Sequence, residues 1–317
     1  MNPKAQLLAR LATERAWLWW ELVGLSEETL VGQPVLGTWT PKDLLAHVAF
    51  WDDVSSERLH LALAGRAAEI PYLGMETVND QVYAERRDWP LAQAVAECQR
   101  ARADFLALLE PLTWEAMTRP YTLSCGDQRS IADWTQRRAG HDADHKRPPR
   151  TWRESAGIKN VPGPQCVLLA ALAAGRAELL AWAGLIPENE RATRLVCGQW
   201  TLPDVLGHVT DWELFVLEGL RQMAAGEVAG TSYGGDEEAW NWEHVRARRG
   251  QPWETTWSDF VAARQKLLTA LQSLDDAALA RPLPSLWSAE DSAYMWARVC
   301  LAHDREHAEG LSKALVR

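Results

Sequence analysis

Histidine is the residue type in this chain whose spacing points most directly to chemistry. Six of the eight histidines form two sets of three, in which one histidine is followed 94 or 95 residues later by a pair spaced four apart. Two imidazoles at i and i+4 face the same side of a helix and can bind one metal ion. Three neutral imidazoles favour Zn, Ni, Cu or Fe and leave coordination positions open to water or substrate. The predicted metal ligands are His47, His141 and His145 in one set and His208, His303 and His307 in the other.

The two histidine sets belong to a tandem duplication. Three blocks return in the same order 161 or 162 residues later: Trp39–Asp52 as Trp200–Glu213, Glu76–Pro90 as Glu238–Pro252, and Trp134–His145 as Trp296–His307. The copies have diverged widely, yet both keep all three histidines, whereas His60 and His244 have no counterpart. This internal comparison favours metal binding over the ordinary role of a satisfied core histidine. We expect two domains, residues 1–155 and 160–317, joined by a linker rich in proline and glycine.

Helical spacing of apolar residues dominates each half. The first half predicts helices over residues 4–24, from Pro41 with Thr40 as N-cap, over residues 75–110 with a break at Pro90, and from Ser130 onward. The second half predicts copies that begin at Thr201, span residues 236–273 with an interruption near Gly250, and begin near Ser288. Pro148 and Pro149 are expected to end a helix. With no sustained strand pattern, the chain should be all-α, one four-helix bundle per half.

Composition excludes several classes of protein. The 317-residue chain has 33 Lys and Arg against 43 Asp and Glu, a net charge of −10. That balance argues against nucleic-acid binding and against attraction to an anionic membrane surface. No apolar run approaches the roughly 20 residues of a membrane-spanning helix, and the N-terminus does not resemble a secretory signal. Five scattered cysteines without C-x-x-C spacing favour the reducing cytoplasm.

Aromatic, amide and acidic residues near the histidines are candidates for the surrounding site. Trp51 and Trp212 lie four residues beyond a predicted ligand on the same helix face, and core packing is the alternative role for them. Asn79 and Asn241, with Glu76 and Glu238 one turn earlier, are the best polar candidates for a pocket. The alternative for the asparagines is a buried amide that satisfies a helix end. The predicted substrate-binding residues are therefore Trp51, Asn79, Trp212 and Asn241.

For other polar residues the sequence predicts structural roles. A carboxylate next to a helical histidine points about 100° away from it, so Asp142 and Asp304 are expected to be solvated surface charges. Asp43 and Asp204 match helix-capping positions, and Trp39 and Trp200 match a hydrophobic staple before the cap. No nucleophile elbow, phosphate loop or dinucleotide fingerprint is present, so the catalytic residues stay unassigned.

The pattern G-x-W-[ST]-x-x-D-x-x-x-H-x-x-x-W occurs at Gly37 and again at Gly198, and in each half a segment with asparagine and then H-x-x-x-H follow it. In these features the chain resembles the DinB-like superfamily, and most of all the branch of the colibactin self-protection protein. The resemblance implies four-helix bundles with a metal-binding histidine triad. Because single-bundle members usually pair as dimers, it also implies that the two halves form an internal pseudo-dimer. Whether the chain stays a monomer or forms a homodimer is left open.

Two functions fit these features. The first is a metal-dependent enzyme, either a hydrolase or a thiol-dependent S-transferase, that acts on a small electrophilic molecule. It would hold one divalent transition metal in each half, most readily Zn or Ni, and the transferase would use a low-molecular-weight thiol. The second is a non-catalytic protein that sequesters a small molecule for self-protection. An open three-histidine set favours the enzyme, since structural zinc sites normally have four protein ligands. Both copies are expected to be functional.

Overall fold

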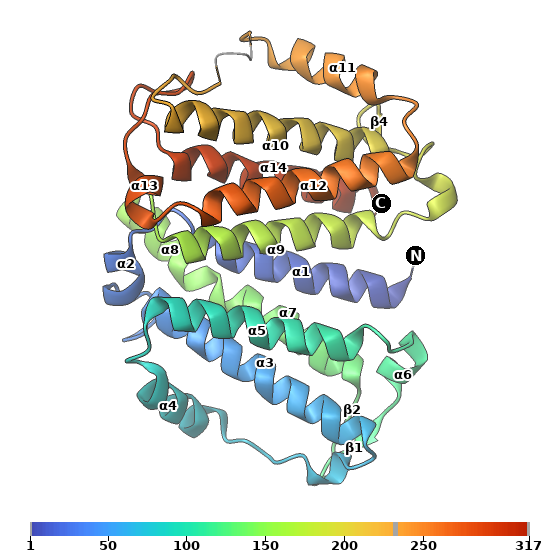
Figure 1. Ribbon diagram of the computed structural model, residues 1–317. Helices are drawn as coiled ribbons and strands as arrows, with labels where there is room; N and C mark the ends of the chain where they lie inside the picture. The colour runs from blue at the N-terminus through green and yellow to red at the C-terminus, as the bar shows by residue number, and fades with distance from the viewer. Residues whose placement is uncertain (1, 231–233, 316–317) are drawn as a thin grey trace. The chain divides into compact units, whose positions relative to one another are not determined.

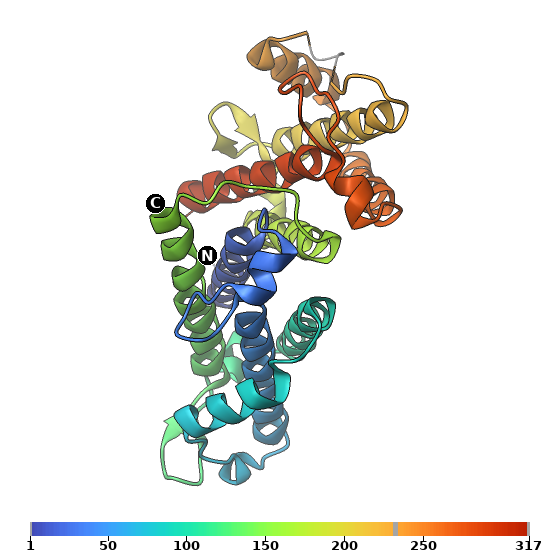
Figure 2. The same cartoon turned by 90° about the vertical axis from the view of Figure 1, so that its left-hand side faces the viewer.

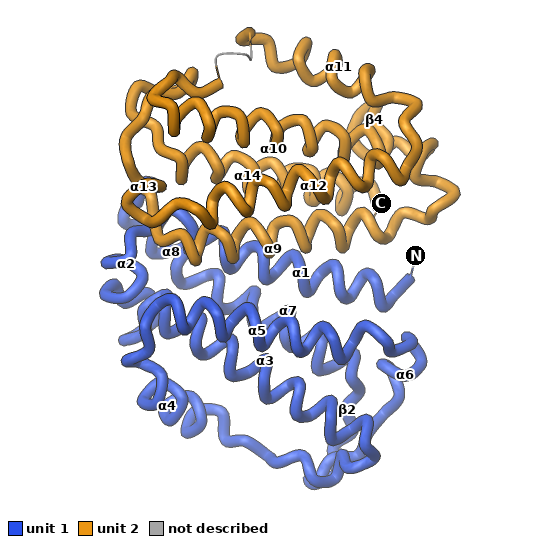
Figure 3. Tube along the Cα trace, in the orientation of Figure 1, with its two compact units in different colours: residues 1–160 blue, residues 161–317 orange. Residues whose placement is uncertain are grey.

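The computed structural model describes residues 2–230 and 234–315. The chain divides into two compact units, unit 1 at residues 1–160 and unit 2 at residues 161–317 (Figure 3). Helices dominate both units, and the strands described are only two or three residues long. The prediction of an all-α chain with two similar halves is confirmed.

Unit 1 contains four long helices and several short elements (Figure 1). Its elements are α1 Pro3–Leu22, α2 Glu27–Gly32, α3 Pro41–Leu63, η1 Ala67–Glu69, α4 Met75–Arg86, α5 Leu91–Leu109, α6 Trp114–Thr118, β1 Tyr121–Thr122, β2 Gln128–Arg129, α7 Ile131–His145 and α8 Arg147–Ala156. The strands β1 and β2 pair antiparallel, with Tyr121 opposite Arg129.

Unit 2 repeats the order of the long helices. Its elements are α9 Gln165–Ala183, η2 Glu188–Glu190, β3 Leu195–Cys197, β4 Trp200–Thr201, α10 Leu202–Ala224, α11 Glu237–Arg248, α12 Trp253–Gln272, α13 Asp276–Ala280 and α14 Ala293–Leu315. The strands β3 and β4 pair antiparallel, with Leu195 opposite Thr201. This strand pair precedes α10, whereas that of unit 1 precedes α7.

Four helices form the core of each unit. In unit 1, α3 packs along α5 and α1 packs along α7; in unit 2, α10 packs along α12 and α9 along α14 (Figure 1 and Figure 2). The shorter α4 and α11 lie outside these bundles, against α3 and α10. As predicted, the third helical region is two helices: α4 ends before Pro90 and α5 follows it, because proline cannot continue the hydrogen-bond ladder.

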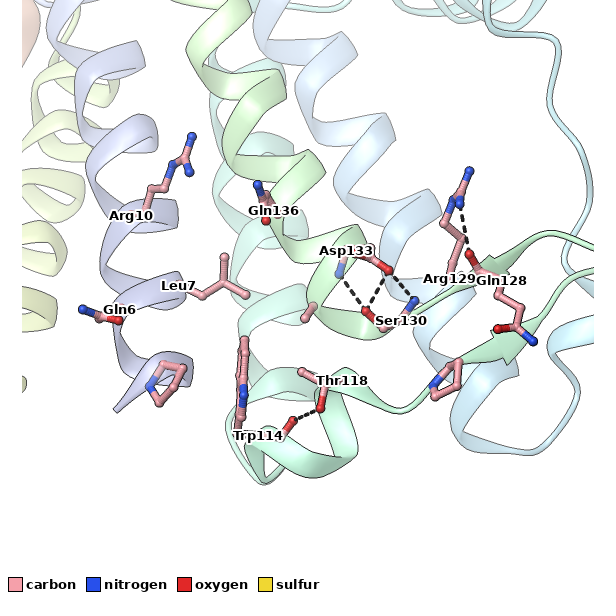
Figure 4. Close-up of a pocket in the computed structure, with 13 residues that line it drawn as sticks. Gln6, Leu7, Arg10, Trp114, Thr118, Gln128, Arg129, Ser130, Asp133 and Gln136 are labelled. Atoms are coloured by element: carbon pink, nitrogen blue, oxygen red, sulfur yellow. Dashed lines mark hydrogen bonds between the residues drawn. The ribbon is translucent and has the colours of Figure 1, made fainter. Parts of the chain in front are cut away.

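Capping boxes fix the starts of α3, α7 and α10, three of the four helices that carry the triad histidines. The Thr40 hydroxyl accepts from the Asp43 amide, and the Asp43 carboxylate accepts from the Thr40 amide at 2.9 Å. Ser130 and Asp133 do the same for α7 (Figure 4), and Thr201 and Asp204 cap α10. Reciprocal capping satisfies two amides that the helix leaves unpaired. The predicted capping roles of Asp43 and Asp204 are confirmed.

One predicted boundary is wrong, and a second is right but incomplete. The last helix, α14, begins at Ala293 instead of near Ser288, because Asp291 exchanges backbone hydrogen bonds of 2.9 Å with Leu283 and is held outside the helix. Pro148 and Pro149 do follow the end of α7, but they also lie in the first turn of α8. Proline is tolerated there, since first-turn amides have no partner within the helix.

The helix α9 contradicts the expectation that no apolar run approaches the length of a membrane-spanning helix. By length and composition alone, the 19-residue α9 could cross a membrane, and 61% of its apolar window is buried inside the protein. It also carries Arg176, whose guanidinium is buried in ion pairs with other helices of unit 2. These features are typical of the central helix of a bundle, which is apolar on most sides because it is covered by protein.

Candidate metal centre

The three predicted ligands of unit 1 converge on one point. His47 is on α3, and His141 and His145 are on α7, one turn apart. The Nε2 atom of His141 lies 3.0 Å from Nε2 of His47 and 3.2 Å from Nε2 of His145. The three rings therefore direct the same nitrogen toward a common centre.

Unit 2 has the same constellation. His208 is on α10, and His303 and His307 are on α14. The Nε2 atom of His303 lies 2.8 Å from Nε2 of His208 and 2.9 Å from Nε2 of His307. Each triad is a group whose nitrogens could hold a metal ion.

These distances fit a metal ion better than a hydrogen-bonded cluster. A neutral imidazole nitrogen carries either one proton or one lone pair, yet Nε2 of His141 faces two other ring nitrogens. One cation accepts all three lone pairs at once. Metal–nitrogen bonds of 2.0–2.1 Å place neighbouring ligand nitrogens about 2.9–3.4 Å apart in octahedral to tetrahedral geometry. The separations in unit 1 fall in that range.

Burial keeps the triad imidazoles neutral. It lowers the pKa of His47 to about 3 and that of His307 to about 4, and the pKa of His141 is lowered further by burial and by Arg138. If Nε2 holds a metal, each ring carries its proton on Nδ1. Within the described residues, Nδ1 of His47, His141 and His145 is buried without a hydrogen-bond partner. Packing, in place of the usual carboxylate or carbonyl, therefore orients these rings.

The lowered pKa values predict an acid-sensitive metal-free fold. Between pH 7 and pH 5 the unfolded chain takes up protons that the folded triads refuse, so the free energy of unfolding falls as pH falls. Each histidine that stays neutral should contribute a loss of about 2 kcal/mol at pH 5. Urea denaturation of chelator-treated protein at the two pH values measures this. His47→Gln should show a smaller loss than wild type, and an equal loss in both proteins would contradict the assignment.

Tryptophan rings lie beside both triads. The ring centroid of Trp39 lies 4.8 Å from that of His47, and the centroid of Trp200 lies 4.7 Å from that of His208. These tryptophans, interpreted from sequence as hydrophobic staples, thus contact a candidate ligand. Trp51 is farther away, at 6.4 Å from both His47 and His141.

The predicted asparagines contact the predicted tryptophans. The indole Nε1 of Trp51 donates to Oδ1 of Asn79 at 3.0 Å, and that of Trp212 donates to Asn241 at 2.9 Å. In unit 1 both residues also line a cavity with the triad. Each asparagine therefore fixes the tryptophan beside the histidines. Glu76 and Glu238 are exposed and are not part of this arrangement.

A buried charge network lies next to each triad, and sequence reasoning missed it. Both oxygens of Asp142 accept from Arg15, at 2.9 and 3.1 Å, and Arg102 donates to Asp142 at 2.8 Å. The same two arginines bind Asp52 at 2.8 and 3.0 Å. These four side chains come from α1, α3, α5 and α7, so the network joins all four core helices of unit 1.

Unit 2 repeats the network with Arg176, Glu213, Arg264 and Asp304 from α9, α10, α12 and α14. The expectation that Asp142 and Asp304 are solvated is wrong: both are completely buried. The two carboxylates point away from the histidine face of their helix, as expected, but that side of the helix faces the interior of the bundle. The repeat itself carried the signal, because all four positions return with the same charge 161 or 162 residues later.

A cavity of about 720 Å³ opens beside the triad of unit 1. That volume lies within the range of small-molecule sites. Its walls include the triad, the predicted substrate-binding residues Trp51 and Asn79, and Trp134. A second hollow of similar volume lies between α1, α6 and the start of α7, and its lining includes no triad residue (Figure 4).

Aromatic side chains occupy the corresponding region of unit 2. Trp296 is fully buried, donates from Nε1 to the Val216 carbonyl at 2.9 Å, and has its ring centroid 4.6 Å from that of Trp287. It packs directly on Gly219, where a Cβ atom would lie 2.4 Å from the indole nitrogen. Unit 2 therefore keeps the triad and packs Trp296 against Gly219, at the position where unit 1 has Arg58.

This packing predicts that Gly219→Ala destabilises unit 2 by about 1–3 kcal/mol, since the indole has no room to shift. Denaturation by urea measures the change. Gly310→Ala is the matched control on α14: no atom lies within 4 Å of its Cβ position, so it should stabilise by about 0.5–1 kcal/mol. Equal effects of the two substitutions would contradict the described packing.

Comparison with known proteins identifies the family. The DinB superfamily matches residues 10–147 and again residues 171–310. No curated protein matches the chain. An uncharacterised protein from Escherichia coli UTI89 is similar in structure, at 17% sequence identity and a TM-score of 0.42, over 50% of this chain and 97% of that protein. The two family matches cover most of the sequence, and the chain belongs to the DinB superfamily, with two tandem copies of its domain.

Proposed function

We propose that this protein is a metal-dependent enzyme that acts on a small electrophilic molecule, as a hydrolase or as a thiol-dependent S-transferase. One divalent transition metal, Zn or Ni, would bind each triad. The observation that carries the proposal is the convergence of three Nε2 atoms, 3.0 and 3.2 Å apart, at the wall of a 720 Å³ cavity. A set of three ligands, one buried and two half-buried, beside open space is typical of catalytic sites and unlike four-ligand structural zinc.

The chain supplies the surroundings for that chemistry. A bound metal would act as a Lewis acid that activates water or a thiol at neutral pH. His47, His141 and His145 stay neutral and able to bind because burial lowers their pKa values. Trp51, held by Asn79, forms an apolar wall for the organic part of a substrate. Asp52 and Asp142 are fully engaged by arginines, so we assign them to holding the helices and not to proton transfer.

The proposed partners follow from the same features. We propose a small-molecule substrate, a low-molecular-weight thiol as cosubstrate of the transferase, and no nucleic-acid or membrane partner. We place the protein in the cytoplasm, as a monomer whose halves form an internal pseudo-dimer or as a homodimer. The net charge of −10 and the free cysteines of the described chain support this proposal.

Multiple turnover distinguishes an enzyme from a protein that only sequesters a small molecule. Metal-loaded protein is incubated with a strained or activated electrophile, such as an epoxide or an aryl ester, with and without glutathione. We expect many substrate molecules to be consumed per chain, and the rate to fall to background in His47→Ala and after chelation. Consumption that stops at one molecule per chain would favour sequestration, and an unchanged rate without metal would overturn the proposal.

A further inference from the structure

Arginine side chains gather on the cavity of unit 1 without matching acids. Four of its lining residues are arginines, Arg58, Arg129, Arg137 and Arg138, and one, Asp127, is a carboxylate. Asp127 already pairs with Arg129 at 3.2 Å. Among residues 2–230 and 234–315, no carboxylate lies within ion-pairing distance of Arg58, Arg137 or Arg138. This cavity is therefore cationic, although the chain as a whole carries a net charge of −10.

Arg138 is the most unusual of the four. Its exposed fraction is 8%, and its Nη1 atom is buried with no hydrogen-bond partner in the described chain. Its guanidinium lies 5.8 Å from the ring of Trp51. Burial lowers its pKa only to about 10, so it remains a cation at neutral pH. An ionised group this buried is costly unless an opposite charge compensates it.

The neighbouring charge network compensates the Arg138 charge only in part, through the attraction of Asp52 and Asp142. Its two carboxylates, Asp52 and Asp142, are each bound by both Arg15 and Arg102, and so are already neutralised. With Arg138, this part of the core of unit 1 holds three arginines against two carboxylates, an excess of one positive charge. Arg138 precedes His141 by three residues on α7 and lines the same cavity, so this charge faces the candidate metal centre.

Unit 2 shows what the domain is like without this cluster. The positions that correspond to Arg58, Arg137 and Arg138 hold Gly219, Val299 and Cys300. Trp296 packs on Gly219. Unit 2 retains the histidine triad and the buried network, so neither of these requires the three arginines.

We infer that Arg138, assisted by Arg58 and Arg137, binds an anionic group of the substrate, a carboxylate or a phosphate, in unit 1 alone; this extends the proposed function of the same site to its substrate class. The planar guanidinium fork matches both groups, and Arg138 lines the same cavity as the triad. The indole rings of Trp51 and Trp134 are part of the apolar lining of the cavity, which suits an aromatic or aliphatic body.

Calorimetric titration of the full-length protein with benzoate, phenyl phosphate and the neutral analogue benzamide tests this inference. We expect one anion to bind per chain, at least about tenfold more tightly than benzamide. Phenyl phosphate against benzoate distinguishes the two anion classes. In Arg138→Met the preference for the anion should disappear, whereas Arg147→Met, which removes an exposed arginine just beyond α7, should retain it. The Arg138 variant should fold, because it loses a buried charge that has no ion-pair partner.

Repeating the titration after chelation separates this inference from the metal proposal. Arg138-dependent binding should persist without metal, because the arginine and not the ion recognises the anion. Equal binding of benzamide and both anions, no binding of either anion, two anions per chain, or no effect of Arg138→Met would each overturn the inference. If the protein contains two metal ions, none of these results would contradict the proposed metal centre. Anion binding in protein that never holds metal would instead overturn only the proposed function.

Discussion

Replacing His141 by alanine should lower the metal content of the purified protein from two ions per chain to one. The Nε2 atom of His141 lies 3.0 and 3.2 Å from the other two ring nitrogens of its triad, so its loss removes one of three converging ligands. Changes to groups that merely support a ligand weaken metal affinity by 10–100-fold, and loss of a ligand should cost at least about 100-fold. Metal analysis of protein purified without chelator measures the stoichiometry.

His60→Ala is the control for this experiment. His60 is an exposed histidine on the same helix as His47, it lies outside the triads, and its variant should retain two ions. His303→Ala should remove the other ion and leave the unit 1 site filled. Two ions in His141→Ala, or one ion in the His60 variant, would show that the metal is bound elsewhere.

Replacing Asp142 by asparagine should reduce the free energy of unfolding by about 3–5 kcal/mol. The substitution preserves size but leaves Arg15 and Arg102 with only the Asp52 carboxylate for two buried positive charges. Removing one partner of a buried ion pair is costly because the remaining charge is uncompensated. Since the network joins the four core helices, urea unfolding of unit 1 should shift to lower concentration.

Asp144→Asn is the matched control, two residues along the same helix. Its carboxylate is 69% exposed and, among the described residues, pairs with Arg147, so the change should stay within about 0.5 kcal/mol. Asp304→Asn should destabilise unit 2 as Asp142→Asn destabilises unit 1. Similar stability of the Asp142 and Asp144 variants would mean that the network contributes little to folding.

Much of the fold could be predicted from the sequence because the chain contains its own comparison. The repeat of Thr40 and Asp43 as Thr201 and Asp204 marked two helix starts, and apolar spacing marked the helices that follow. The i, i+4 pairs placed two histidines of each triad on one face. The apolar stripes that predict a bundle indicate that His47 and His208 face its interior, and the family resemblance implies that they join the pairs in a metal-binding triad.

The surroundings of the triads were harder to predict. Sequence spacing gives the direction in which Asp142 leaves its helix, but not whether solvent or another helix lies there. Three more helices contribute side chains to its network, and such convergence is a tertiary property. The same holds for the cavities: Gly219 in place of Arg58 is visible in the sequence, yet its consequence depends on where Trp296 packs.

The two copies therefore differ more in the residues beside their triads than in the triads themselves. We still predict that both halves bind metal. For substrate binding we propose unit 1, where the cavity and its arginines are found together.

An anomalous-difference map, from crystals grown without added metal and measured at the absorption edge of the metal identified by fluorescence, tests the central claim most directly. We predict two peaks per chain, each about 2.0–2.2 Å from the three Nε2 atoms of one triad. Triads without a peak, or imidazole rings turned away from one another, would contradict the account.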